Sequence, residues 1–171
     1  MFRYSAITKT IDESDTSILS NITKVKMYKF ITPTLNNGTK YTLSFNNAFF
    51  NPHSGHNSAA GGVVSSTGFK ISGDDTNEHF LDDDGAGNIR VYYLSGTTRI
   101  YTDSTYGTID YTNGEIILTS ANITSISNID GAASARVRVT VSPDSNDIVP
   151  VRNQVLSIDT ANSTVSGSID E

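Results

Sequence analysis

The chain has 171 residues, a mass of 18.4 kDa and a formal net charge of −6 at pH 7. This length suffices for one well-buried domain and excludes two full-sized ones. The acidic charge argues against nucleic-acid binding, which needs concentrated basic residues. No apolar run reaches the roughly 20 residues of a membrane-spanning helix, and Met1 is not followed by a secretory leader.

Uncharged polar residues are unusually common, with 22 Ser, 21 Thr and 15 Asn, whereas apolar residues make up only 36%. The apolar residues are mostly β-branched or aromatic, which favours strands over helices. The absence of Cys excludes disulfides and sulfur-ligated metal sites. We therefore expect a mainly β fold that is held by sheet hydrogen bonds or by neighbouring chains.

The first predicted element is a short helix with Asp12 as its N-cap and an apolar face of Ile18, Leu19 and Ile22. Residues 24–31 alternate polar and apolar side chains and predict a strand. An Asn-Asn-Gly turn precedes a second predicted strand over residues 40–45, and the two strands could form a hairpin.

Residues 46–66 are rich in Asn, Ser and Gly and predict a long irregular loop, of a length that is usually functional or ordered by a partner. Strands are predicted beyond it over residues 68–72, 78–81, 89–94 and 97–101, the last two as a hairpin. Residues 82–88 are predicted to form the turn that precedes this hairpin.

The strongest hairpin signal is Asn113-Gly114 between the strand-like runs 108–111 and 116–118. Residues 135–141 alternate strictly, so Val137, Val139 and Val141 are predicted to face a core. Apolar runs at 148–151 and 155–158 follow, with Arg152, Asn153 and Gln154 between them.

Two groups of residues are candidate metal ligands. Asp82, Asp83 and Asp84 before Gly85 could converge on Ca²⁺, although their spacing is not that of an EF-hand and the same residue types form ordinary turns. His53 and His56 could bind a transition metal, but no third ligand lies nearby in the sequence. Neither group is predicted to be a metal site, and we predict no cofactor.

No nucleophile elbow, P-loop or dinucleotide fingerprint is present, so the sequence does not indicate an enzyme. The most unusual local composition lies near the end of the chain. We name Asp147, Pro150, Arg152, Asn153 and Gln154 as candidate partner-interface residues, because long polar side chains between apolar pairs can hydrogen-bond across an interface.

Three segments carry a resemblance to a known family: residues 66–74, 80–90 and, above all, 145–154. They resemble the C-terminal portion of a tail baseplate wedge subunit of T-even-type contractile-tailed bacteriophages, and the likeness is closest to versions in phages of marine cyanobacteria. Residues 8–31 also resemble the segment before the C-terminal region of baseplate-J-like proteins.

The resemblance implies a structural protein of the virion, assembled in the host bacterial cytoplasm, that pairs with copies of itself and with other wedge proteins in a ring around the tail hub. It implies no small-molecule substrate. Family members are several times longer, so the chain resembles a C-terminal fragment. The alternative is a carbohydrate-binding or adhesin-type β-sandwich, whose binding face could use Tyr92, Tyr93, Tyr101, Tyr106 and Tyr111.

The predicted architecture is an antiparallel β-sandwich-like domain with hairpins, preceded by a short helix and strand. Residues 1–40 are predicted to form a helix–strand segment that remains from a preceding domain. Residues 41–158 are predicted to form the β-rich C-terminal domain, and residues 159–171 a flexible tail.

Overall fold

The structure is a computed structural model that describes residues 2–56, 62–149, 156–160, 163–164 and 166. Within these ranges the chain forms one short helix, and strands make up most of the remaining regular structure, so the mainly β prediction is confirmed. In chain order the elements are α1 (Tyr4–Asp12), β1 (Met27–Ile31), β2 (Thr39–Ser44), β3 (Val64–Ser66), β4 (Phe69–Ile71), β5 (Asp74–Asp83), β6 (Asn88–Ser95), β7 (Thr98–Asp110), β8 (Glu115–Ala121), β9 (Ile123–Ile126) and β10 (Val137–Val141).

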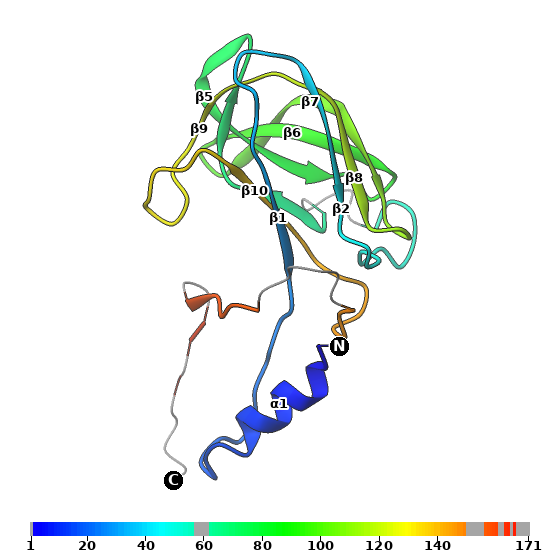
Figure 1. Cartoon of the computed structure of the whole chain (residues 1–171), viewed down its shortest axis with the longest axis vertical. Coiled ribbons are helices and arrows are strands. Elements are labelled where there is room, and N and C mark those ends of the chain that lie inside the picture. The colour runs from blue at the N-terminus through cyan, green and yellow to red at the C-terminus, as the bar shows by residue number, and fades with distance from the viewer. Residues whose placement is uncertain (1, 57–61, 150–155, 161–162, 165, 167–171) are drawn as a thin grey trace.

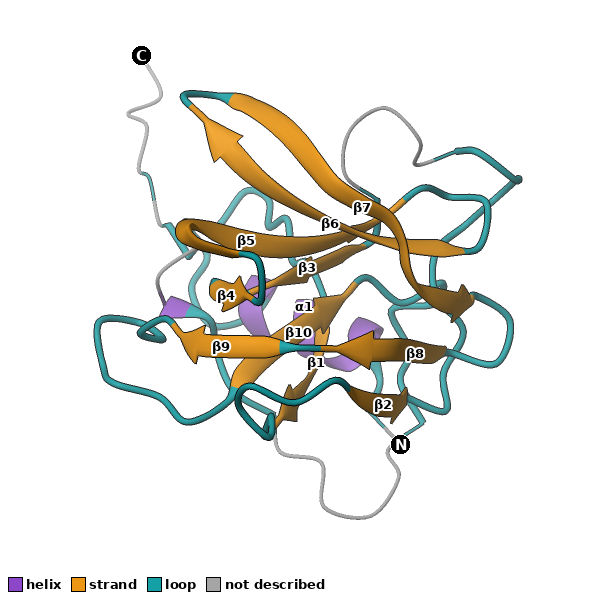
Figure 2. Cartoon of the chain, turned by 90° about the horizontal axis from the view of Figure 1, so that it is seen from above, coloured by secondary structure: helices purple, strands orange, loops and turns teal. Residues whose placement is uncertain are grey.

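The larger of two antiparallel sheets has seven strands in the order β2-β8-β7-β6-β5-β4-β9. It is strongly curled and forms a half-barrel (Figure 1, Figure 2). Three successive hairpins, β5–β6, β6–β7 and β7–β8, form its centre. Short connections between neighbouring antiparallel strands explain why the last two of these hairpins could be predicted from local turn signals.

The smaller sheet has the order β1-β10-β3, and its central strand β10 carries the predicted alternation. Val137, Val139 and Val141 are each 0% exposed, which confirms the predicted core face. They belong to one hydrophobic cluster that also contains Ile89 and Ile116 of the half-barrel. The apolar residues of both sheets therefore share a single core.

Two of the predicted turns are confirmed and both depend on glycine. Asp110 pairs with Glu115 around a four-residue loop that ends at Gly114, where φ is +65°. Ser95 pairs with Thr98 around a two-residue loop that begins with Gly96 at φ +62°. These left-handed backbone conformations favour glycine, because it has no Cβ to clash with the backbone.

The predicted position of the first helix is wrong. The helix ends at Asp12, the residue that was expected to start it, and uses Tyr4, Ile7 and Ile11 as its partly buried face. Beyond the helix, the Asp15 carboxylate accepts hydrogen bonds from the Ser17 backbone N–H and hydroxyl group, at 2.8 and 2.7 Å. Such local side-chain bonds compete with helical hydrogen bonds.

The predicted hairpin between residues 24–31 and 40–45 is also wrong. Strand β1 pairs with β10, whereas β2 pairs with β8, so the two strands lie in different sheets. The loop predicted over residues 46–66 is interrupted by β3 and by the buried side chain of Phe49. The division of the chain into a leading segment, a β-rich domain and a tail stays a prediction.

Candidate functional site

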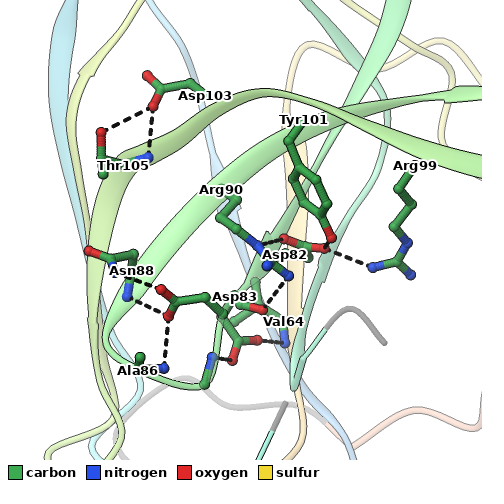
Figure 3. Close-up of polar contacts among 12 residues, drawn as sticks. Val64, Asp82, Asp83, Ala86, Asn88, Arg90, Arg99, Tyr101, Asp103 and Thr105 are labelled. Carbon is green, nitrogen blue, oxygen red and sulfur yellow. Dashed lines mark hydrogen bonds and ion pairs between the residues drawn. The ribbon is translucent and has the colours of Figure 1, made fainter. Parts of the chain in front are cut away.

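The three aspartates considered as calcium ligands lie where β5 ends. The turn predicted over residues 82–88 starts later than expected, because Asp82 and Asp83 are still in β5 and only Asp84 lies beyond it. Asp82 and Asp83 belong to β5 and are 1% and 0% exposed. Successive side chains of a strand point to opposite faces of the sheet. The Asp82 and Asp83 carboxylates therefore cannot converge on one cation, and each has its own set of partners (Figure 3).

Asp82 is the centre of a network on one face of β5, β6 and β7. It accepts hydrogen bonds from Arg90 Nε and Arg99 Nη1, both at 2.8 Å, and from the Tyr101 hydroxyl at 2.9 Å. The Arg90 guanidinium stacks on the Tyr101 ring, and that of Arg99 stacks on the Tyr92 ring. One buried carboxylate thus orients two arginines whose side chains alternate with aromatic rings.

The charges of this network determine the pKa shifts of its members. Burial disfavours the charged form of Arg90, but the hydrogen bond and the charge of Asp82 outweigh burial and raise its pKa. The pKa of Tyr101 is raised, first by burial and then by its hydrogen bond to Asp82. The arginine therefore stays charged, the tyrosine stays neutral, and neither is prepared for proton transfer near neutral pH.

Asp83 points to the other face of β5 and fastens the chain that leads into β3. Its Oδ1 accepts the backbone N–H groups of Val63 and Val64 at 2.7 and 2.9 Å. Its Oδ2 accepts the Tyr111 hydroxyl at 2.7 Å and the Gly85 N–H at 3.3 Å. Burial, followed by the hydrogen bond to Asp83, raises the Tyr111 pKa. This carboxylate is fully used in holding β3 and the β7–β8 turn together.

Asp84 organises the tight turn between β5 and β6. It accepts the N–H groups of Ala86 and Asn88 at 2.8 and 2.9 Å and the Asn88 side-chain amide at 2.6 Å. Burial raises the Asp84 pKa, but the hydrogen bonds from Asn88 and Ala86 outweigh burial, and the net shift is downward. All three carboxylates thus bind protein donors, and the described part of the chain contains no group of three His, Asp or Glu that could hold a metal ion.

The second candidate pair, His53 and His56, lies together on the surface. Nδ1 of His56 is 3.1 Å from Nε2 of His53, and the rings meet edge to face. The third histidine of the chain, His79, lies elsewhere: it is buried beside Asp74, with its Nε2 atom 3.5 Å from the Asp74 Oδ2 atom. The two imidazole rings therefore contact each other, as in a hydrogen-bonded pair on the surface.

Of the five predicted partner-interface residues, Pro150, Arg152, Asn153 and Gln154 lie outside the described residues. The fifth, Asp147, is exposed, and its Oδ1 accepts the backbone N–H of Tyr4 at 2.8 Å. That N–H is in the first turn of α1, where a carboxylate is favoured by the helix dipole. Asp147 therefore joins the start of the helix to the chain that follows β10.

The residues next to Asp147 extend this junction between the two ends of the chain. The Phe2 N–H donates to the Ile148 carbonyl at 3.1 Å. The Asn47 side chain exchanges two hydrogen bonds with the backbone of Val149, at 3.1 and 3.2 Å. The segment that leads to the predicted interface is thus anchored both to the N-terminus and to the loop after β2.

Among the described residues, the most exposed large apolar side chains lie in the two terminal segments. Five large apolar side chains are more than half exposed: Leu19 (78%), Ile22 (89%), Val149 (57%), Leu156 (67%) and Ile158 (81%). None of these residues is in a strand, and α1 itself has no buried residue. Figure 1 shows α1 and the last described residues below the β-sheets, at one end of the molecule. We call these five residues the terminal apolar set.

The five tyrosines considered for a carbohydrate-binding face do not share one surface. Tyr92 packs against Tyr101 on one face of β6, whereas Tyr93 packs against the buried His79 on the other. Tyr101 and Tyr111 donate their hydroxyl groups to Asp82 and Asp83. Burial raises the pKa of Tyr106 to about 12.

Sequence reasoning missed the burial of Asp82 and Asp83. The pattern Asp-Asp-Asp-Gly is typical of an exposed turn. The available signal was long-range: Arg90 and Arg99 lie on the strands that follow and alternate with tyrosines. The exposure of Leu19 and Ile22 was also missed, because their spacing was interpreted as the apolar face of a helix.

No family model matches the chain, and neither the curated proteins nor the solved structures contain a significant match. Within the described residues, no helix has the length and apolar character needed to cross a membrane.

Proposed function

We propose that this protein is a structural subunit of a contractile-tail phage baseplate wedge, which helps to form the ring that links wedges around the tail hub. Its role is to bind other protein chains in the virion, and no chemical reaction is part of it. The proposal combines the sequence resemblance over residues 66–74, 80–90 and 145–154 with one structural observation. That observation is the terminal apolar set.

Exposed aliphatic side chains in water are common singly, but a group of them at one end of a protein indicates a protein interaction site. Val149 of the terminal apolar set belongs to the junction at Asp147, which includes the start of the predicted partner segment, and Ile22 precedes Thr23, whose carbonyl accepts the Tyr4 hydroxyl at 2.9 Å. Contacts with neighbouring proteins would remove these side chains from water, and each fully buried Leu or Ile contributes about 1.5–3 kcal/mol. The same contacts would hold α1, which buries little of its own surface.

The test is co-assembly with the other baseplate wedge proteins of a contractile-tailed phage. The proteins are produced together, and the assemblies are separated by sedimentation and imaged by electron microscopy. We expect this chain to be present in wedge or ring particles. Ile22→Asp should strongly reduce its incorporation, because it places a charge inside a protein interface.

The matched control is Leu94→Asp. Leu94 is also a large exposed aliphatic residue, but it lies near the β6–β7 turn and outside the terminal apolar set. The incorporation of the Leu94→Asp variant into wedge or ring particles should equal that of the unaltered protein. Equal losses for both variants, or no incorporation of the unaltered protein, would contradict the proposal. Selective binding on a glycan array that Tyr101→Ala abolishes would favour the carbohydrate-binding alternative.

A further inference from the structure

Leu156 and Ile158, near the end of the chain, are spaced like the apolar residues on one face of a β-strand. They are 67% and 81% exposed, and residues 156–158 belong to no strand. Residues two apart in an extended chain face the same side. An extended segment would therefore present Leu156 and Ile158 on one face, with Ser157 on the other.

The half-barrel offers such a segment an edge that is only partly covered: the Asn36 N–H donates to the Ile123 carbonyl at 2.8 Å, whereas Ser125 and Ile126 border a groove. Strand β9 is one outer strand of the seven-stranded sheet and pairs with β4. Natural edge strands are usually protected by charged residues or proline, as β2 is by Lys40 at the opposite edge. Strand β9 has the sequence Ile-Thr-Ser-Ile, with no charge and no proline. An added strand could therefore pair with the part of β9 beyond Ile123 without burying a charge.

An apolar groove lies beside this edge. It has a volume of about 420 Å³, and its lining includes Ser125 and Ile126 of β9, together with Pro33, Leu35 and Ala135. An apolar cavity of about 150 Å³ holds one benzene-sized group. The groove therefore has room for two aliphatic side chains, which is the number that residues 156–158 present on one face.

We propose that residues 156–158 of one copy add as a strand to β9 of a second copy, with Leu156 and Ile158 in the groove. This mode of recognition combines main-chain hydrogen bonds with pockets for alternate side chains. Figure 1 shows β9 near the top of the molecule, whereas residues 156–160 lie below the sheets. The donating and accepting surfaces are thus different parts of the chain.

An interface between two different surfaces repeats head to tail, and it closes into a ring when the rotation between copies allows it. The inference deepens the proposed function, because it names one contact through which a structural subunit would meet its own copies. It predicts self-association of the purified protein without any other baseplate component.

Disulfide crosslinking provides the test, because the chain contains no Cys. Ser125→Cys places a thiol on β9, and Ser157→Cys places one on the added segment; both serines are exposed. A mixture of the two single variants should form a covalent dimer on mild oxidation, whereas each variant alone should form little covalent dimer, because its interface brings a thiol next to a serine. The matched control is Thr42→Cys on the other edge strand, β2, which should not crosslink to Ser157→Cys.

A second measurement uses complementation. Leu156→Asp with Ile158→Asp removes the donating surface, and Leu35→Asp alters the groove at an exposed residue. Light scattering from about 1 μM to 1 mM, a range that includes weak complexes, should show larger species for the unaltered protein. It should show monomers for each variant alone and a species of two chains for their mixture, because one intact interface remains.

Several results would overturn the inference. One is an unaltered protein that is monomeric throughout this range, and another is equal crosslinking at Thr42→Cys and Ser125→Cys. A third is a disulfide that forms within the monomeric double variant Ser125→Cys/Ser157→Cys, because the segment would then occupy its own groove. Any of these results combined with normal wedge co-assembly would leave the proposed function standing. Crosslinking of Ser125→Cys to Ser157→Cys without wedge co-assembly would support this inference and contradict the proposed function.

Discussion

At the level of single residues, Asp82 shows how a carboxylate can be buried in a protein with a modest core. Its two oxygens accept three charged or polar donors, so the cost of its desolvation is offset by charge-assisted hydrogen bonds. The partners come from two other strands. The network therefore also fixes the register of β5, β6 and β7.

Replacing Asp82 by Asn keeps the size of the side chain but removes its charge. Arg90 and Arg99 then lose their common counter-charge, and we expect the free energy of unfolding to fall by about 3 kcal/mol. Urea denaturation followed by circular dichroism measures this change. Asp144→Asn, at an exposed position, should cost less than about 0.5 kcal/mol. Equal effects of the two substitutions would show that the network does not stabilise the fold.

His79 gives the fold a dependence on pH. It is fully buried between Phe69 and Tyr93, which are its pairing partners on β4 and β6, and the charged group beside it is Asp74. Burial lowers the His79 pKa, although the charge of Asp74 partly opposes the shift. The unfolded chain therefore binds a proton more readily than the folded chain does.

Stability should accordingly fall as the pH decreases below about 6.5, the ordinary pKa of histidine, and stop falling once the folded protein is also protonated. The aspartates with lowered pKa, such as Asp74 and Asp84, lose their contributions only below about pH 4. Melting temperatures measured across this range should show the His79 step in the unaltered protein. His79→Gln should remove the step that begins at about pH 6.5, the ordinary histidine pKa, and leave the lower one; persistence of the upper step would refute the assignment.

At the level of elements, two glycines in the hairpin turns allow the cost of backbone strain to be compared with the cost of a steric clash. Gly96 and Gly114 have nearly the same positive φ. A Cβ added to Gly96 would meet nothing within 4 Å, whereas a Cβ on Gly114 would lie 2.0 Å from the Asn47 carbonyl oxygen. The β7–β8 turn is therefore packed directly against the loop after β2.

Gly96→Ala should cost about 1 kcal/mol, the usual penalty for a left-handed conformation. Gly114→Ala should cost a further 1–3 kcal/mol or so, because the turn or the loop must move. Chemical denaturation of the two variants side by side measures the difference. If both substitutions cost the same, the close approach to Asn47 is not present in solution.

The elements that could be predicted from the sequence are those whose signals are local. Alternation identified the buried face of β10, and the Asn113-Gly114 pair identified the β7–β8 turn. The partner of β1 could not be predicted, because β1 and β10 are more than a hundred residues apart in the chain. The burial of Asp82 and Asp83 depends in the same way on residues that only the assembled sheet brings together.

At the level of the whole molecule, the β-sheets and the terminal segments differ in how they are held. The strands share one hydrophobic core, whereas α1 buries no residue, and hydrogen bonds of Phe2 and Tyr4 join its start to the segment that follows β10. Segments with few buried contacts open at low free energy. The terminal segments are therefore the part of the protein whose order depends most on a partner.

Amide hydrogen exchange tests this division across the chain. In dilute protein, β7, β8 and β10 should exchange slowly, through global unfolding, whereas α1 and residues 156–160 should exchange quickly. At concentrations that favour self-association, protection should rise together in β9 and residues 156–158, because each would form the other's missing pairs. Strand β2, at the opposite edge, should not change. If protection rises at β2 instead, or in α1 alone, the contact between copies lies elsewhere and the inference about β9 is wrong. The description of the two sheets would still hold.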